Sequence, residues 1–247
     1  MKRLLTICAV AAVMVFATSA AYALPVLSDD FDDGTMDTTL WTLYEDDHSS
    51  AWLDETSGRL EFRATASADD LAALYIANDW GFVPTEDFSF NVGFHYSSTI
   101  SGSVLLGLAK DIEDNDVWLD AGYEESAIFY WDALVGGSVI DANEKLRSSD
   151  NGTLYISYNA ATDDLYVSDS GYGAGNAWGT ILDLVQGAWD ADVVSPLLGG
   201  SADEALPSGA AYLDNFVVNS GMIIPEPATI GLLGLGSLTL LRKRRRV

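Results

Sequence analysis

The chain of 247 residues contains one cysteine, Cys8, and only two histidines, His48 and His95. A single thiol cannot form a disulfide within the chain. Two histidines give little material for a zinc centre or for a nucleophile that histidine activates. Cys8 stands very near the start and follows the bulky Ile7, which argues against a lipid-attachment site. Cysteine chemistry and zinc chemistry are therefore not expected.

Basic residues are also scarce: 12 Lys and Arg stand against 37 Asp and Glu, for a formal net charge of −25. Most of the basic residues belong to the two ends, and those between residues 24 and 221 are Arg59, Arg63, Lys110, Lys145 and Arg147. Nucleic acids and anionic lipids require clustered Lys and Arg, so both are excluded as partners. An acidic exported protein and a protein that binds divalent cations both fit this composition.

Long apolar runs occur only at the two ends. Lys2 and Arg3 precede the apolar residues 4–16, and Ala21-Tyr22-Ala23 supplies small residues at the expected cleavage positions. This order is typical of a secretory signal peptide. We therefore predict a signal peptide over residues 1–23, with cleavage between Ala23 and Leu24.

At the other end, residues 228–241 carry no charge and would form a helix about 21 Å long, short for a membrane core of about 30 Å. Three glycines in this run are typical of membrane helices rather than soluble ones. The alternative is a buried C-terminal helix with a solvated tail. We predict a short transmembrane helix whose basic end stays on the cytoplasmic side, held by Arg242, Lys243, Arg244, Arg245 and Arg246.

Pro225, Glu226 and Pro227 stand directly before this run. The order of a Pro-Glu-Pro motif, a short apolar segment and a basic end resembles the PEP-CTERM sorting signal of exported bacterial proteins, here over residues 222–247. The resemblance implies recognition and removal of the tail by an exosortase, an integral-membrane transpeptidase. It implies a precursor tethered to the inner membrane that later reaches the cell surface or extracellular matrix. It implies nothing about the body of the protein.

Residues 24–221 are long enough for one domain, and their pattern is that of short strands. Apolar and polar residues alternate in 59–63, 88–92, 153–158 and 165–167, and further candidate strands are 74–77, 104–108, 117–119, 128–131 and 212–218. The sequence predicts a turn at residues 150–152 and a hairpin loop over 159–164. Residues 171–209 read as a long glycine-rich loop, with a short helix or strand within 180–189. An all-β sandwich or jelly roll is predicted.

Two stretches resemble the concanavalin A-like lectin and glucanase superfamily, which includes laminin-G-like domains. Ser28 to Gly34 reads SDDFDDG and is followed by Leu40-Trp41 and Gly58-Arg59-Leu60, while residues 212–218 read YLDNFVV. The resemblance implies a single jelly-roll β-sandwich in which the first and last strands lie side by side. Members of the superfamily often bind calcium or sugar, and some cleave polysaccharides.

The laminarinase-like hydrolases of that superfamily carry Glu-x-Asp-x-x-Glu on one strand. Glu45 and Asp47 begin this pattern, but Ser50 occupies the position of the second glutamate. We therefore expect a protein that is not an enzyme and that binds a glycan, such as an exopolysaccharide, or another surface partner. A divergent glycan-cleaving enzyme and a purely structural matrix component are the alternatives. His95 alternates with Phe94 and Tyr96 and is expected on a strand face.

Candidate ligand residues follow from the same resemblance. Asp30 and Asp214 are predicted to meet where the first and last strands pair, as a candidate calcium site, and backbone carbonyls or water would complete the six to eight oxygens that calcium needs. A loop beginning at Asp111 is not an EF-hand, because Asp116 and Gly122 replace the required Gly and Glu. Tyr172 and Trp178, in the glycine-rich segment, are the candidate exposed rings for stacking on sugar.

Overall fold

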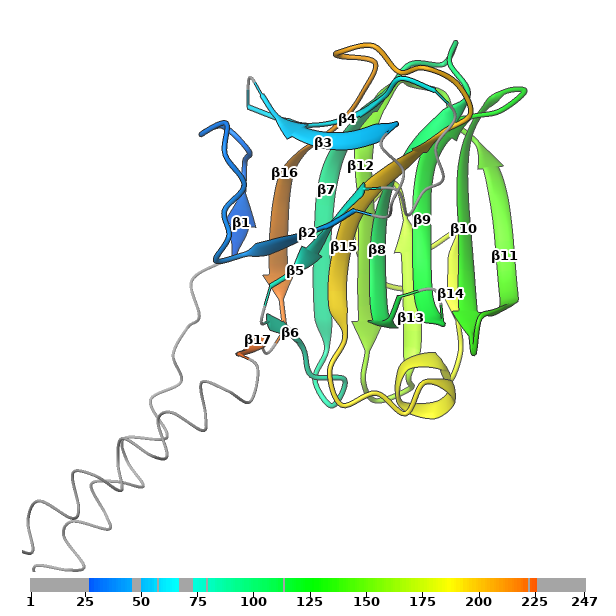
Figure 1. Ribbon diagram of the computed structural model, residues 1–247. Coiled ribbons are helices and arrows are strands. Elements are labelled where there is room, and N and C mark those ends of the chain that lie inside the picture. The colour runs from blue at the N-terminus through cyan, green and yellow to red at the C-terminus, as the bar shows by residue number, and fades with distance from the viewer. Residues whose placement is uncertain are drawn as a thin grey trace, which may run out of the picture.

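The computed structural model describes residues 27–45, 50–56, 58–66, 73–78, 80–112, 114–221 and 223–225. Its architecture is two antiparallel β-sheets packed face to face, with little helix (Figure 1). In Figure 1 the sheet that contains β8, β9 and β10 lies in front of the sheet that contains β7 and β12. The prediction of an all-β sandwich is confirmed.

The rear sheet, sheet A, is centred on two long strands. Its order is β14 (Gly179–Ile181), β13 (Asp164–Ser168), β12 (Asn151–Asn159), β7 (Phe88–Tyr96), β16 (Ala211–Ser220), β4 (Leu60–Ala64) and β3 (Ala51–Glu55), and β1 (Ser28–Asp29) also pairs with β16. β1 and β16 are antiparallel, with Ser28 opposite Val217. The chain therefore begins and ends its body in the same sheet, as the resemblance implied.

The front sheet, sheet B, has seven strands. Its order is β11 (Ser138–Leu146), β10 (Ala127–Val135), β9 (Asn115–Tyr123), β8 (Gly102–Asp111), β15 (Ser195–Ala202), β5 (Ala73–Ala77) and β2 (Trp41–Glu45). A small third sheet pairs β17 (Ile223–Pro225) with β6 (Trp80–Phe82).

The core lies between the two sheets and explains the alternation in the sequence. Along β7, Phe88, Phe90, Val92, Phe94 and Tyr96 are buried, while the residues between them are partly exposed or smaller. One face of each central strand contributes in this way to a single apolar cluster. Burial of these side chains is the main source of stability. Its aromatic members include Trp41, Phe62, Trp80, Phe82, Phe129, Trp131, Tyr158, Trp189 and Phe216.

The opening SDDF segment is tied to the core by Asp29. One oxygen of its carboxylate accepts a hydrogen bond from the backbone N–H of Phe31 at 2.9 Å, and the other accepts one from Nε1 of Trp41 at 2.8 Å. Phe31 is buried although its φ is +54°, a conformation that Asp29 stabilises by this turn. Phe216 of β16 packs edge-on against Trp41 at 5.0 Å. These contacts close the sandwich.

Several local expectations were wrong. The turn expected at residues 150–152 ends earlier, because Asn151 and Gly152 already pair with β7 as the first residues of β12. The predicted loop over 171–209 contains the whole of β15, a central strand of sheet B, whereas the short helix or strand expected within 180–189 is present as β14 and a π-helix at Leu184–Ala188. β11 was also not predicted. The hairpin loop between Asn159 and Asp164 is confirmed.

Candidate functional site

The outer face of sheet B carries a row of side chains that the register brings together. Asp120 of β9 lies opposite Tyr130 of β10, which lies opposite Glu144 of β11. Leu105 of β8 continues the row beyond Asp120. Paired positions on one face have Cβ atoms about 5 Å apart, so Tyr130 stands between two carboxylates.

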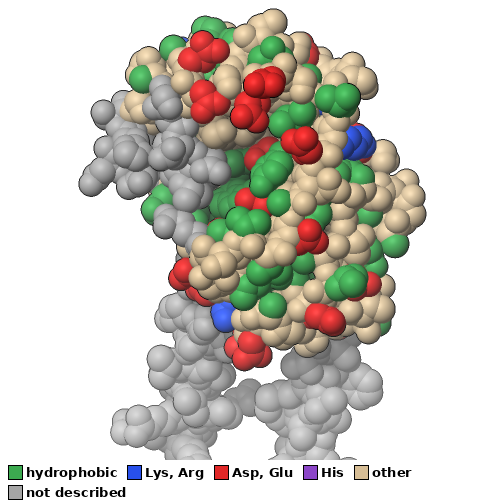
Figure 2. All heavy atoms as spheres, turned by 90° about the vertical axis from the view of Figure 1, so that its right-hand side faces the viewer, with side chains coloured by type: hydrophobic (Ala, Val, Ile, Leu, Met, Phe, Trp, Pro, Cys, Tyr) green, Lys and Arg blue, Asp and Glu red, His purple; other side chains and the backbone are tan. Residues whose placement is uncertain are grey.

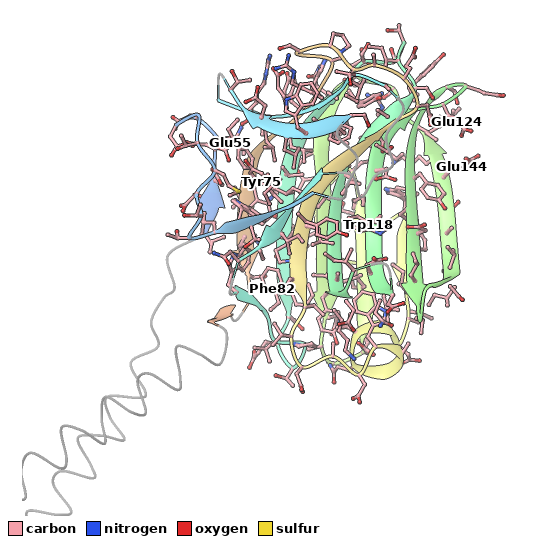
Figure 3. The ribbon with its side chains drawn as sticks, in the orientation of Figure 1. Glu55, Tyr75, Phe82, Trp118, Glu124 and Glu144 are labelled. Atoms are coloured by element: carbon pink, nitrogen blue, oxygen red, sulfur yellow. The ribbon has the colours of Figure 1, made fainter. Side chains whose placement is uncertain are left out.

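The next row holds Trp118, which is labelled in the middle of this face in Figure 3. Its indole lies across Gly107 of β8 so closely that a Cβ there would come within 2.8 Å of the ring. Trp118 is 5% exposed and packs with Leu105, Ala109 and Leu197 in an apolar cluster separate from the sandwich core. The glycine gives the ring room to lie flat on the sheet.

A hollow of about 270 Å³ opens on the same face. Its floor includes glycines, which have no side chain to fill it. The backbone packs closely there, and a Cβ on Gly122 would lie 2.5 Å from the carbonyl oxygen of Gly102. Figure 2 shows a recess with hydrophobic side chains in its depth and acidic side chains around it, and Figure 3 places Glu124 and Glu144 at the upper right of the face. The lining residues are Gly102, Ser103, Asp120, Gly122, Tyr123, Glu124, Ile128, Tyr130, Glu144, Ser201 and Asp203.

The electrostatics of the hollow are those of an acceptor-rich, anionic site. Burial raises the pKa of Tyr130, and the charges of Asp132, Asp120 and Glu144 raise it further, so its hydroxyl stays a donor at neutral pH. Among the described residues, no Lys or Arg lines the hollow. Carboxylates, hydroxyls and two aromatic rings can bind a polyhydroxylated neutral molecule, whereas an anion would be repelled.

The carboxylate spacing bears on catalysis. The outer face of β9 reads Asp116, Trp118, Asp120, and positions four apart on a strand have Cα atoms about 13 Å apart. Asp116 and Asp120 therefore stand on either side of Trp118 on one face of the strand. Asp132 of β10 lies opposite Trp118, and is therefore a diagonal neighbour of Asp120.

Tyr172 and Trp178, the expected exposed rings, are both partly buried. The Tyr172 hydroxyl accepts a hydrogen bond from the Asn91 side-chain amide. Trp178 packs against the sandwich core, with its ring centroid 6.4 Å from that of Phe129 and the Lys145 ammonium 5.7 Å away. The glycine-rich segment folds back onto the sheet and leaves the two rings only partly accessible, and sugar binding by them stays a prediction.

Asp30 and Asp214 do lie near each other. Burial raises the pKa of Asp214, and the charge of Asp30 raises it further. Within the described ranges no three or more Asp, Glu, His or Cys residues are grouped to hold a metal ion. A calcium ion would therefore need carbonyl oxygens or water for most of its ligands. Calcium at this pair stays a prediction.

The first residue of the predicted sorting motif, Pro225, belongs to a strand that pairs with the folded body. Pro225 ends β17 and stands opposite Trp80 of β6 in the register. Glu226, Pro227 and the basic residues Arg242 to Arg246 lie outside the described residues, as do the predicted signal peptide and the apolar segment 228–241. In the part of the chain that the structure describes, no helix is long and apolar enough to span a membrane.

A comparison with protein-family models matches residues 224–246 to the PEP-CTERM protein-sorting motif. The expected resemblance of the tail is confirmed, and the motif implies an exported protein that is anchored in the membrane before processing. No curated protein matches the chain.

Solved structures resemble the body. A putative β-glucanase from Mycobacterium abscessus has a TM-score of 0.54 at 14% identity, covering 78% of this chain and 99% of that one. The endo-β-1,3-glucanase of Pyrococcus furiosus has a TM-score of 0.55 at 9% identity, covering 80% and 94%. The GH43B protein of a Bacteroides ovatus xyloglucan locus has a TM-score of 0.57 at 16% identity, covering 83% and 41%. At these identities the comparison shows the fold, a concanavalin A-like jelly roll.

The hollow itself was missed in the sequence. A signal was present, because Asp116, Trp118, Asp120 and Gly122 alternate along one face of a strand. What was missing is the pairing of β9 with β10, which sets Tyr130 beside Asp120.

Proposed function

We propose that this protein is exported, released from its tail, and delivered to the cell surface or extracellular matrix, where its body binds a neutral glycan without cleaving it. The observation that supports the binding site is the row Asp120, Tyr130, Glu144 beside a hollow on the outer face of sheet B. This row combines an aromatic side chain with hydrogen-bond acceptors on both sides.

The charge of the hollow selects the class of glycan. Asp120, Glu124, Glu144 and Asp203 line it, and each would repel a uronate or a sulfated sugar. Neutral sugars present hydroxyl donors to the same carboxylates, and the bonds are charge-assisted. A hollow of about 270 Å³ is slightly smaller than the usual ligand pocket of about 300–1,000 Å³, which favours a short stretch of a chain over a large ligand.

Binding can be tested by calorimetric titration with neutral oligosaccharides, including β-1,3-glucan and xyloglucan fragments, and with oligouronates of equal length. We expect binding to the neutral sugars alone. Tyr130→Ala and Glu144→Gln should each weaken it at least about tenfold. Tyr155→Ala is the matched control, because Tyr155 is a partly buried tyrosine of β12 in the other sheet. Preference for the uronates, or equal effects of all three variants, would contradict the proposal.

A second candidate is a glycan-cleaving enzyme, and the carboxylates of Asp120 and Asp132 favour it. Diagonal neighbours on adjacent strands have Cα atoms about 7–8 Å apart. Carboxyl groups at about 6.5–9.5 Å are typical of inverting glycosidases. Release of reducing ends from the same neutral polysaccharides, lost in both Asp120→Asn and Asp132→Asn, would establish this activity and overturn the non-catalytic proposal.

The sorting step has its own test. Exosortase is proposed to recognise Pro225, Glu226 and Pro227 and to remove the segment ending in Arg242 to Arg246. Glu226→Ala in the natural host should leave the tail-bearing form in the membrane fraction. If the mass of the released protein still includes the basic residues, processing does not occur.

A further inference from the structure

The edge strand β11 is unusually open. It forms the margin of sheet B and, among the strands that the structure describes, pairs only with β10. Eight of its nine positions are exposed. Five large apolar side chains are exposed among the described residues, and three of them lie on β11: Val139 at 57%, Ile140 at 51% and Leu146 at 75%. A long edge with apolar side chains is a template for pairing with another strand.

The other sheet margins differ from β11. The opposite margin of sheet B is β2, with five residues, and sheet A ends in β14 with three residues and β3 with five. Native proteins keep edge strands short to prevent pairing. β11 has nine residues and no proline, and its one bulge, at Ile140, lies toward the start of the strand and leaves residues 141–146 in regular register. Its length is therefore evidence that the edge has a partner.

The charge of β11 suits an identical partner. The body as a whole is strongly acidic, so two copies repel each other over most of their surface. β11 is an exception, because it carries a basic residue, Lys145, beside its two acids, Asp141 and Glu144. A second copy can approach here without meeting a surface of uniform negative charge.

We propose that a second copy of this chain pairs with β11 in antiparallel fashion, about a two-fold axis at Asn143. In this register Asp141 of each copy faces Lys145 of the other, and Leu146 lies beside the bulge at Ile140, so each contact occurs twice. Centring the pair on Asp141, Glu144 or Lys145 would set like charges opposite each other, which is destabilising. Centring it on Ala142 would leave every charged residue opposite an uncharged one.

The side chains lie on the faces that this pairing needs. Asp141 and Lys145 stand opposite Ala133 and Phe129 of β10, whose side chains point into the sandwich. Leu146 stands opposite Ile128, on the outer face. Residues that face each other in an antiparallel pair share one side of the sheet. Asp141 and Lys145 of the two copies therefore meet on the inner side.

Lys145 can bind Asp141 of the second copy and still keep its ion pair with Asp169 of its own chain. Its ammonium lies 2.6 Å from Oδ1 of Asp169, and its side chain is still 39% exposed. An ammonium has three donors, so it can bind Asp169 of its own chain and Asp141 of the other copy.

The pairing has a consequence that rests on the proposed function. A two-fold axis normal to the sheet turns the outer faces of both sheets B in the same direction. The two hollows would then lie on one continuous surface, and one polysaccharide could occupy both. Avidity could raise the apparent affinity for long chains about 100-fold or more over that for short ones.

Cross-linking tests the register directly. Antiparallel neighbours have Cα atoms about 4.5–5.5 Å apart, within the range that a disulfide spans. In a Cys8→Ala background, Asn143→Cys should give a covalent dimer under mild oxidation, and Ser138→Cys, on the same strand but far from the axis, should not. Equal cross-linking of the two variants, or none, overturns the two-fold arrangement.

Exchange of the charges at positions 141 and 145 tests whether the partner is a second copy of this chain. Analytical ultracentrifugation of the exported protein should show a concentration-dependent dimer. Asp141→Lys alone and Lys145→Asp alone should each remain monomeric, because like charges then face each other. A mixture of the two variants should restore a dimer, because each copy then meets its complement. A monomeric wild type at high concentration, or a mixture no more dimeric than its components, refutes the pairing. Neither measurement uses a glycan, so each stands apart from the binding proposal.

Discussion

Two glutamates on paired neighbouring strands are almost equally hidden from solvent and behave in opposite ways. Glu61 of β4 is 0% exposed and Glu55 of β3 is 8% exposed. The pKa of Glu61 lies below its usual value, whereas the pKa of Glu55 rises to about 7. Similar burial thus accompanies opposite pKa shifts, and the cause must lie in their partners.

Glu61 is surrounded by donors. Burial alone would raise its pKa, but hydrogen bonds outweigh it: Arg59 donates at 2.6 and 2.9 Å, the Ser208 hydroxyl at 2.8 Å, and the Gly209 N–H at 3.2 Å. Since each donor favours the charged form, Glu61 stays ionised at neutral pH.

Glu55 lies among acids. Burial is the largest cause of its raised pKa, a hydrogen bond from the Tyr75 hydroxyl offsets part of it, and the charges of Asp29, Asp33 and Asp37 add to it. Figure 3 shows Glu55 and Tyr75 at the side of the sandwich near β1. A chain with so few basic residues supplies a cation to one buried glutamate and not to the other.

The largest effect is expected from removing the charge of Glu61. Glu61→Gln keeps the shape of the side chain but leaves Arg59 without its carboxylate, which should cost about 2–4 kcal/mol of unfolding free energy at pH 7. A group with a depressed pKa stabilises the fold above its unfolded pKa, near 4.5, and the effect is lost as the pH falls through its folded pKa. Urea unfolding at pH 7 and at pH 4 measures both.

The exposed Glu86→Gln is the control and should change stability by less than about 0.5 kcal/mol. A loss for Glu61→Gln that is as large at low pH as at pH 7 would show that packing, rather than charge, is responsible.

The role of Glu55 could not be read from the sequence, because Asp29, Asp33 and Asp37 approach it only in the folded chain. Glu61 differs, since Arg59 stands two positions before it, the spacing that places side chains on one face of a strand. The pairing of the first and last strands was expected from the resemblance of SDDF and YLDNFVV to the concanavalin A-like superfamily. β15 was missed because Pro196, Gly199 and Gly200 disfavour strands. Gly200 is needed there, since a Cβ would come within 2.7 Å of the Phe62 ring.

Glu55→Gln should increase the free energy of unfolding, in contrast to the decrease expected for Glu61→Gln. The folded pKa of about 7 exceeds the unfolded value of about 4.5, so ionisation destabilises the fold as the pH rises through this window. The variant should therefore gain about 1–3 kcal/mol at pH 8 and nothing below pH 4.5. Thermal unfolding across pH 4–8 tests this expectation. A gain that does not depend on pH would mean that the glutamine packs better, and the comparison with Glu61 would fail.

Glu61 is surrounded by hydrogen-bond donors and Glu55 by acids. A calcium ion would be a third kind of partner for buried or crowded carboxylates, and Asp30 and Asp214 are the candidate ligands. A ligand that binds only the folded state at ten times its Kd adds about 1.4 kcal/mol. Calcium should raise the melting temperature beyond sodium at matched ionic strength, and Asp214→Asn should remove the excess. Equal shifts from the two cations would show a screened acidic surface without a site.

The smallest expected effect concerns how much the surrounding acids contribute to the raised pKa of Glu55. Asp33 is exposed, and its Oδ1 accepts hydrogen bonds from the N–H and hydroxyl of Thr35, which an asparagine can also accept. Asp33→Asn therefore removes a charge without removing the turn. Because solvent screens exposed charges, the pKa of Glu55 should fall by about half a unit or less, measured by NMR titration of its carboxyl carbon.

Asp32→Asn is the control, since Asp32 is also exposed and is not among the charges that shift the pKa of Glu55. Equal shifts in both variants would assign the effect to net charge rather than to the position of Asp33. A fall well beyond one unit would mean that the acids, and not burial, govern the protonation of Glu55.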